Sequence, residues 1–227
     1  MGAEIAKKKL QFSFKKTRII PGKLPSEEIQ RGCLQEIDVL LERARKGEIH
    51  VVFSDPTHKV HNTVPARCWQ RQGKEGTLLI RSNSGRKRIT ILGFFNPISY
   101  NFTSLVTESN CDQFAMAMAH EELRKAYPDG KEIVVIQDNA GYNHAYAKWE
   151  RCSELKFIPY FLPAYCPNLN LIERLWKFMK ATIIHNEYYE KFSEFHQAIL
   201  DFCGNLEKYS EDLQNLMSHK FEILKAV

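Results

Sequence analysis

Three carboxylates occupy positions from which a folded chain could bring them together. Asp55 follows the apolar run at 49–53, Asp138 follows the run at 132–137, and Glu173 lies in a later amphipathic segment. Because strand ends in an α/β sheet open onto one crevice, Asp55 and Asp138 are expected to converge there. At about 100° per residue, Glu173 borders the apolar face of its helix, the side that faces the sheet. Carboxylates this close repel one another unless a cation neutralises them, which indicates Mg²⁺, with Mn²⁺ as a substitute.

Such a site has a defined chemistry. Two metal ions held by three acids would activate a water or a 3′-hydroxyl and stabilise the leaving oxygen in an attack on a phosphodiester. Lys177 and Lys180 flank Glu173, so positive charge could contact phosphate beside the acid. A second group of candidate DNA contacts is the basic run Arg86, Lys87 and Arg88.

Each of these residues also has a structural interpretation. An aspartate after a strand is more often a turn or helix-cap residue than a ligand. Asn170 and Glu173 could form a capping box at a helix start. His58 and His61 have the spacing of a metal pair, but on an irregular loop they would be hydrogen-bonded or solvated. Composition and spacing alone leave these alternatives open.

The overall composition is that of one large globular domain. The chain has 227 residues, of which 44% are hydrophobic and 26% charged, which excludes a disordered chain, a fibrous repeat or a small disulfide scaffold. No apolar run is long enough to span a bilayer, so no membrane association is expected. The net charge of +5 permits a nucleic-acid partner without requiring one. Six cysteines without a CxxC pair predict reduced thiols in a cytoplasmic protein.

The elements that must position the acids follow from periodicity and turn residues. A helix is expected at 26–45, and an antiparallel meander at 49–53, 77–80, 89–95 and 99–106. Helices and strands then alternate: helices at 110–127 and 144–153, strands at 132–137 and 156–162, and helices at 170–186, 193–206 and 211–225. A meander followed by this alternation predicts an α/β fold, with a mixed sheet covered by helices.

Three sequence strings carry a resemblance to a known family. FSDPTHKVHN, VVIQDNAGYNHA and FLPAYCPNLNLIERLWKFMK resemble the three acid-bearing motifs of DDE transposases, and are most similar to the bacterial insertion-sequence branch of the mariner superfamily. The 34 residues between the second and third acids are a typical interval for that branch. The resemblance covers roughly residues 15–211. The sequence departs from the usual motifs at Cys166, Ala164 and Pro56, none of which is a metal ligand.

The resemblance implies a ribonuclease H-like fold, a mixed five-stranded sheet flanked by helices. Asp55, Asp138 and Glu173 would be the metal-binding catalytic acids, holding two Mg²⁺ ions. The implied activity is DNA cleavage at element ends, followed by transfer of the freed 3′-hydroxyl into target DNA, within a homodimer. Residues expected to orient the acids or touch DNA are His58, His61, Asn139, His144 and Asn170.

We expect three regions: a basic N-terminal linker or arm at 1–25, the catalytic domain at 26–210, and a C-terminal helical tail at 211–227. Residues before Ser26 leave no room for a helix-turn-helix region, so a separate helix-turn-helix subunit from a split reading frame, or a truncated product, is expected. The alternatives are a ribonuclease H-like nuclease without strand transfer, and an inactive DNA-binding remnant. The expected location is the bacterial cytoplasm, in association with the nucleoid.

Overall fold

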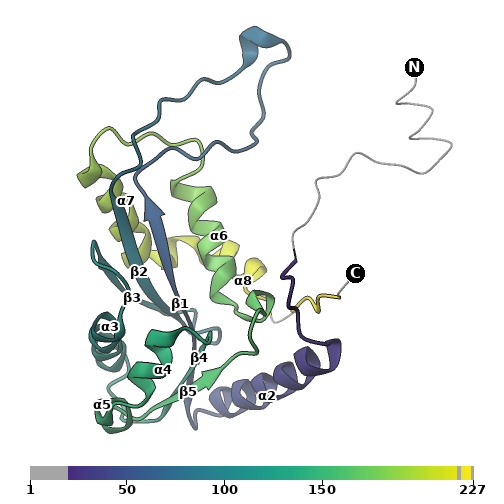
Figure 1. The fold of residues 1–227 in the computed structure, drawn as a ribbon, viewed down its shortest axis with the longest axis vertical. Helices are drawn as coiled ribbons and strands as arrows, with labels where there is room; N and C mark the ends of the chain where they lie inside the picture. The colour runs from purple at the N-terminus through teal and green to yellow at the C-terminus, as the bar shows by residue number, and fades with distance from the viewer. Residues whose placement is uncertain (1–19, 219–220, 226–227) are drawn as a thin grey trace, which may run out of the picture.

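A five-stranded mixed sheet forms the centre of the protein (Figure 1). The computed structural model describes residues 20–218 and 221–225, so most of the predicted N-terminal region 1–25 lies outside the described residues. The strands are β1 (His50–Val60), β2 (Arg88–Phe95), β3 (Phe102–Thr107), β4 (Ile133–Gln137) and β5 (Phe157–Phe161). Their order is β3-β2-β1-β4-β5, with β1, β2 and β3 antiparallel and β4 and β5 parallel to β1. This topology confirms the predicted fold class.

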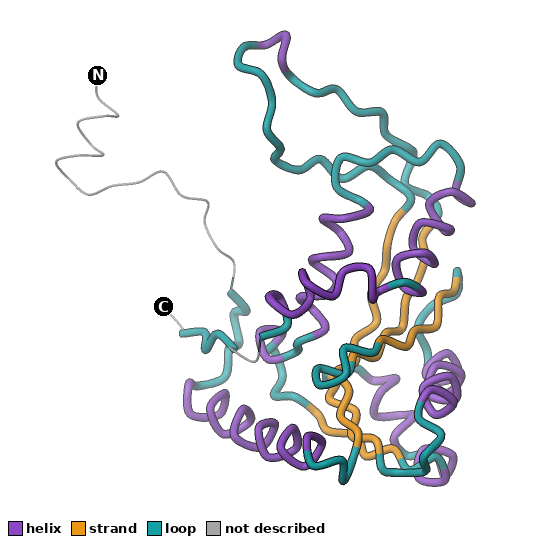
Figure 2. Tube along the Cα trace, turned by 180° about the vertical axis from the view of Figure 1, so that it is seen from behind, coloured by secondary structure: helices purple, strands orange, loops and turns teal. Residues whose placement is uncertain are grey.

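Helices cover both faces of the sheet, which Figure 2 shows from behind. One face packs on α2 (Glu27–Arg45), α6 (Ile172–Ile183), α7 (Phe192–Gly204) and α8 (Ser210–Leu216), and the other on α3 (Gln113–Ala126), α4 (Gly141–Ala147) and α5 (Glu150–Glu154). Short 3₁₀ turns lie at η1 (Lys74–Gly76), η2 (Pro167–Leu169) and η3 (Leu206–Tyr209). Within the described ranges, every helix is too short or too polar to cross a membrane.

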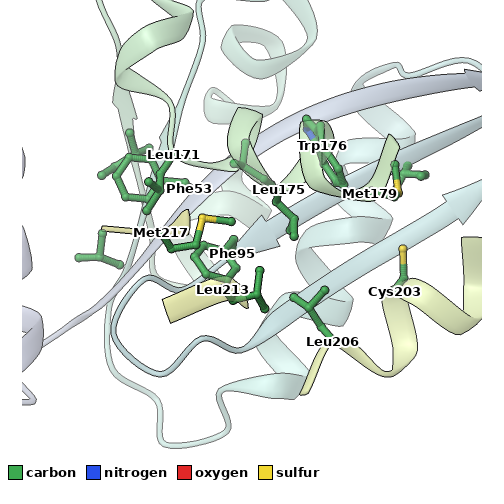
Figure 3. Close-up of a cluster of buried hydrophobic side chains, with 14 of the residues drawn as sticks. Phe53, Phe95, Leu171, Leu175, Trp176, Met179, Cys203, Leu206, Leu213 and Met217 are labelled. Carbon is green, nitrogen blue, oxygen red and sulfur yellow. The ribbon is translucent and has the colours of Figure 1, made fainter. Parts of the chain in front are cut away.

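Strand alternation divides the core in two. Val51 and Phe53 of β1 contribute to the cluster beneath α6, whereas Val52 contributes to the cluster beneath α3. The larger cluster joins strands to α6 and to the C-terminal helices, as Figure 3 shows for Phe53, Trp176 and Met217. This packing fixes α6, and therefore Glu173, against the sheet.

One predicted strand is wrong, and another is longer than predicted. Residues 77–80 are not a strand but part of a long excursion between β1 and β2, where Leu78 and Leu79 are exposed and no neighbouring strand pairs with them. β1 does not end before Pro56 but continues to Val60. Beyond Phe53 the parallel partner β4 no longer pairs with β1, so proline removes no ladder hydrogen bond on that side.

A buried histidine makes the stability of the fold depend on pH. Burial lowers the pKa of His120 to about 4, because its ring is enclosed by Phe94, Tyr146 and Phe157 while Nδ1 lies 2.8 Å from the Met116 carbonyl oxygen. Its pKa returns to the ordinary value of 6.5 on unfolding. The contribution of the neutral His120 ring to the unfolding free energy is therefore fully present above pH 6.5 and is lost as the pH falls towards 4. Between pH 7 and pH 5, the unfolding free energy of the His120→Gln variant should fall by about 2 kcal/mol less than that of the unmodified protein. Urea unfolding of both proteins at the two pH values measures this, and identical pH dependence would contradict it.

Candidate active site

Asp55 and Asp138 lie side by side on neighbouring parallel strands. The last pair that β1 and β4 share is Phe53 with Ile136, and each aspartate stands two residues further along. The same register, extended by two residues, sets Asp55 opposite Asp138, at a strand spacing of about 4.8 Å. Residues two apart in a strand share a face, so both carboxylates are on the face that packs on α6.

The prediction that Asp55 follows the end of a strand is wrong in detail. Asp55 lies within β1 and pairs with Gly93 of β2. Asp138 does follow the end of β4, as expected. It is the shorter partner strand that opens the crevice: β4 ends at Gln137 and leaves the adjacent side of β1 free.

Glu173 completes the group from α6. All three acids line one pocket of about 420 Å³, with the Pro-rich segment 162–167 also forming part of its wall. The Asn170 side chain donates to the Ser54 carbonyl oxygen at 3.0 Å, which ties the start of α6 to β1 beside Asp55. The capping-box alternative for Asn170 is therefore wrong, since the N-cap position of α6 is Leu171, without a side-chain cap.

Trp176 holds Asp55 by a direct hydrogen bond. Its indole Nε1 donates to Asp55 Oδ2 at 3.1 Å, although the side chain is otherwise core. The indole reaches the strand because Gly93 has no side chain: a Cβ there would lie 2.6 Å from Trp176 Cη2. The aromatic stripe of α6 thus has a role in the site as well as in the core.

The acids strongly perturb one another. Burial, followed by the charges of Glu173 and Asp138, raises the pKa of Asp55 to about 8. The Glu173 side chain is open to the pocket, yet desolvation by the surrounding walls raises its pKa, against the lowering effect of Lys180 and Lys59. The metal-free site therefore carries more carboxylate charge than its surroundings stabilise.

Lys59 is a site residue that the sequence did not reveal. It lies on the same face of β1 as Asp55, is only 4% exposed, and donates to Thr57 Oγ1 at 2.6 Å. Burial, then the charge of Lys180, lowers the pKa of its ammonium group to about 8, while Glu173 and Asp55 oppose the shift. The alternation of side chains along a strand, counted from Asp55, was the sequence signal that could have identified Lys59.

Asn143 is a second residue that sequence reasoning missed. This buried side chain donates to Asp138 Oδ1 at 2.8 Å, and the Ala140 backbone N–H donates to the same oxygen at 3.1 Å. The Asp138 carboxylate is thereby oriented by the first turn of α4. The signal was the position of Asn143 five residues after the acid, at the start of a short helix.

The donor set fits a hard divalent cation. Three carboxylates around one pocket, two of them with raised pKa values, are ligands whose mutual repulsion a cation would relieve. In residues 20–218 and 221–225, no three His, Cys, Asp or Glu side chains are grouped closely enough to hold a metal ion as they stand. Ions bound between the acids that line this pocket would retain water or phosphate ligands.

The predicted supporting residues divide between the pocket and other places. Asn139 lines the pocket and donates to the Leu162 carbonyl oxygen, and His144 lies 3.3 Å from Asn139 Oδ1. His58 is not on a loop but within β1, on the face opposite Asp55, where its ring contacts Thr90. His61 is also away from the acids, with its Nε2 2.8 Å from the Tyr189 carbonyl oxygen.

The predicted DNA contacts lie in two groups. Lys177 and Lys180 are exposed on α6, near Glu173. The second group, Arg86, Lys87 and Arg88, is exposed where the excursion enters β2. Lys87 Nζ lies 4.8 Å from the centre of the Phe192 ring.

The sequence of the chain is similar to those of known proteins. A family model described as DDE superfamily endonuclease matches residues 50–196, more than half of the chain and all three acids. The chain is also 28% identical over 108 residues to the uncharacterized protein y4pE/y4sA of Sinorhizobium fredii (strain NBRC 101917 / NGR234), covering 48% of this chain and 76% of that protein.

Solved structures share the fold at low identity. The Mos1 mariner paired end complex with Mn superposes with a TM-score of 0.65 at 15% identity, covering 96% of this chain and 67% of that chain. The Mos1 strand transfer complex gives 0.62 at 14%, covering 99% and 70%. The catalytic domain of Mos1 mariner transposase gives 0.55 at 14%, covering 88% and 94%. These similarities confirm the predicted ribonuclease H-like sheet.

Proposed function

The chain belongs to the DDE superfamily endonuclease family, and from that premise we propose that it is a transposase catalytic domain. It would cleave DNA strands at element ends and join the freed 3′-hydroxyl to target DNA. The observation that carries this proposal is the grouping of Asp55, Asp138 and Glu173 around one pocket. The transposases that share the fold support the strand-transfer step. The assignment to the bacterial insertion-sequence branch stays a prediction.

We further propose that the three acids hold two Mg²⁺ ions, with Mn²⁺ as a substitute. The structural neighbours solved with Mg and with Mn support a divalent ion. When bound, such ions activate an attacking hydroxyl and stabilise a leaving oxygen. The carboxylates of Asp55, Asp138 and Glu173 are the donors that this chain supplies.

Neighbouring side chains would hold the acids in place before metal and substrate bind. Trp176 fixes the Asp55 carboxylate and Asn143 fixes that of Asp138, so neither acid has to be ordered when substrate arrives. Lys59 and Lys180 supply positive charge beside the acids. Asn139 and Asn170 line the same pocket as polar groups that could contact substrate.

DNA is the proposed partner. The exposed cations on α6 and at the start of β2 would contact phosphate through Lys177, Lys180, Arg86, Lys87 and Arg88. A homodimer that pairs two element ends, and a separate helix-turn-helix subunit, are further proposals. The domain limits 1–25, 26–210 and 211–227 remain proposals, but the predicted helix at 211–225 is too long, since α8 ends at Leu216 and residues 221–225 are not helical. A nucleoid-associated cytoplasmic location is a further proposal, which the six free thiols support.

Two assays test the proposal. Supercoiled plasmid incubated with the protein should be nicked when Mg²⁺ or Mn²⁺ is added and stay intact in EDTA. A labelled DNA end with a pre-formed 3′-hydroxyl, incubated with plasmid, should yield joined product. Nicking without joining would identify a nuclease instead, and neither product at any metal concentration would identify an inactive remnant.

The hydrogen bond from Asn143 to Asp138 should affect the metal concentration that the protein requires for nicking. Asn143→Ala leaves the Asp138 carboxylate without its side-chain donor, so the metal concentration for half-maximal nicking should rise about 10- to 100-fold. Asn215→Ala is the matched control, because Asn215 is exposed on α8 and bonds only within that helix. Metal titrations of both variants measure the effect, and equal titration curves would contradict it.

A further inference from the structure

A second hollow, of about 470 Å³, lies where the end of β1 meets the end of α6. It shares no lining residue with the catalytic pocket. The ionisable residues that line it are all basic: His58, Lys59, Lys180 and His185. The His58 ring contacts Thr90 on the opposite face of β1, so the two lysines and His185 are the cations of this hollow.

Lys59 is a buried cation without an anionic partner. The residue is only 4% exposed, and lysine is almost never buried to this extent unless it is paired. Its Nζ donates to Thr57 Oγ1 at 2.6 Å, which uses one of the three N–H donors of the ammonium group. Within residues 20–218 and 221–225, no carboxylate forms an ion pair with Lys59. Two donors of a buried charge therefore remain for water or for a bound ligand.

Lys180 brings a second positive charge to the same hollow. It is exposed in the last turn of α6, and its charge contributes to the lowered pKa of Lys59. His185 follows directly, with its backbone N–H donating to the Lys180 carbonyl oxygen at 2.8 Å. The apolar side chains of Val60 and Ile184 form part of the wall, and walls of low polarity strengthen the field of nearby charges. The hollow therefore favours an anion.

The acids balance these lysines only while they hold no metal. Both lysines lower the pKa of Glu173, which shows that they interact favourably with its carboxylate in the metal-free protein. Two divalent ions would more than neutralise the three carboxylates, and the lysines would lose that attraction. Negative charge would then have to come from the substrate.

We propose that this hollow binds a backbone phosphate of the DNA strand that reacts at the acids, through Lys59, Lys180 and His185. The proposal rests on the proposed function and deepens it, by assigning a phosphate site away from the reacting centre. Glu173 and Lys180 are seven residues apart in α6, which corresponds to about 10 Å along the helix axis. At about 3.4 Å per nucleotide of a duplex strand, the bound phosphate should lie about three nucleotides from the reacting position.

Fluorescence anisotropy of labelled DNA in EDTA measures this contact without cleavage. Lys59→Met keeps most of the side-chain length but removes the charge, so it should weaken binding about fivefold and reduce the slope of log K against log salt by about 1. Lys180→Met should behave alike, whereas Lys180→Arg should retain most of the affinity because the charge is kept. Lys208→Met is the matched control, since Lys208 is exposed on η3. An equal loss in the control would reduce the effect to net charge and overturn the proposal.

Neutral linkages in the DNA locate the phosphate. In the joining assay the reacting 3′-hydroxyl fixes the register of its strand, so a single methylphosphonate can be moved step by step away from that end. The linkage about three nucleotides from the end should slow joining several-fold in the unmodified chain. The same linkage should have little further effect in Lys59→Met or Lys180→Met, because the contact is already lost. Effects that are the same at every linkage, or the same in the variants, would overturn the proposal.

The remaining outcomes separate this site from the proposed function and from other roles of Lys59. If Lys59→Met changes the metal concentration needed for nicking but not DNA affinity, the lysine serves only the acids and the proposal is overturned. If inorganic phosphate raises the thermal midpoint through Lys59 while DNA affinity does not depend on Lys59 or Lys180, the hollow holds a free anion, which also overturns it. In both cases the proposed function stands. If the unmodified chain neither binds nor nicks DNA, the proposed function itself fails.

Discussion

Replacing Asp55 by Asn is expected to reduce metal-dependent DNA nicking by at least about a thousandfold. Asn is nearly isosteric and can still accept the Trp176 hydrogen bond, but it removes a negative ligand from the group with Asp138 and Glu173. Asp138→Asn and Glu173→Gln should behave alike, because all three acids line the same pocket and are proposed to hold the same ions. The measurement is the rate of conversion of supercoiled to nicked plasmid at saturating Mg²⁺ or Mn²⁺.

The same substitution should leave the fold intact. The Asp55 carboxylate is repelled by Glu173 and Asp138, so replacing it relieves repulsion in the metal-free protein. The thermal midpoint in EDTA should therefore be unchanged or higher. Isothermal titration should show weakened binding of the metal alone. Nicking that survives in all three variants would refute the assignment of the acids.

Gly93→Ala is expected to destabilise the protein by about 2 kcal/mol and to reduce nicking at the same time. The added Cβ would lie 2.6 Å from Trp176 Cη2 and 2.9 Å from Phe102 Cε2, closer than van der Waals contact permits. Both rings are packed edge-to-face, with centroids 5.9 Å apart, so the indole cannot retreat without losing that packing. A displaced indole no longer donates to Asp55, which joins the loss of stability to a loss of activity.

A double-mutant cycle separates this clash from a general effect of alanine. Trp176→Phe removes the two indole atoms that lie nearest to the new Cβ, while Phe102 Cε2 remains, so Gly93→Ala should cost less in that background. Gly32→Ala is the matched control: nothing lies within 4 Å of its added Cβ, and alanine in a helix interior should be neutral or stabilising. Urea unfolding of the four proteins of the cycle and of the control measures the coupling. Equal costs for Gly93→Ala in both backgrounds would contradict the proposed contact.

Much of the fold was predictable because its signals are local. Apolar runs and turn residues located β2 at 88–95, β4 at 133–137 and the helix α2 almost to the residue. The excursion at 61–87 was mispredicted as containing a strand, because residues 77–80 have the residue types of a strand. A strand requires a neighbour, and whether one is present is decided by the tertiary fold.

The sequence by itself singled out the three acids, because their motifs are short and chemically specific, and the structure places all three around one pocket. It could not determine what holds them. Nothing in the sequence distinguishes Asn143 and Lys59, which reach the acids only through the placement of α4 and β1. Trp176 looks like a core residue in the sequence, and its hydrogen bond to Asp55 depends on the space left by Gly93. The six basic residues and one acidic residue at 61–87 can be counted in the sequence, but only the structure shows that this segment projects from the body of the protein. Composition is a sum over the chain, whereas electrostatics and hydrogen bonding depend on distances that only folding sets.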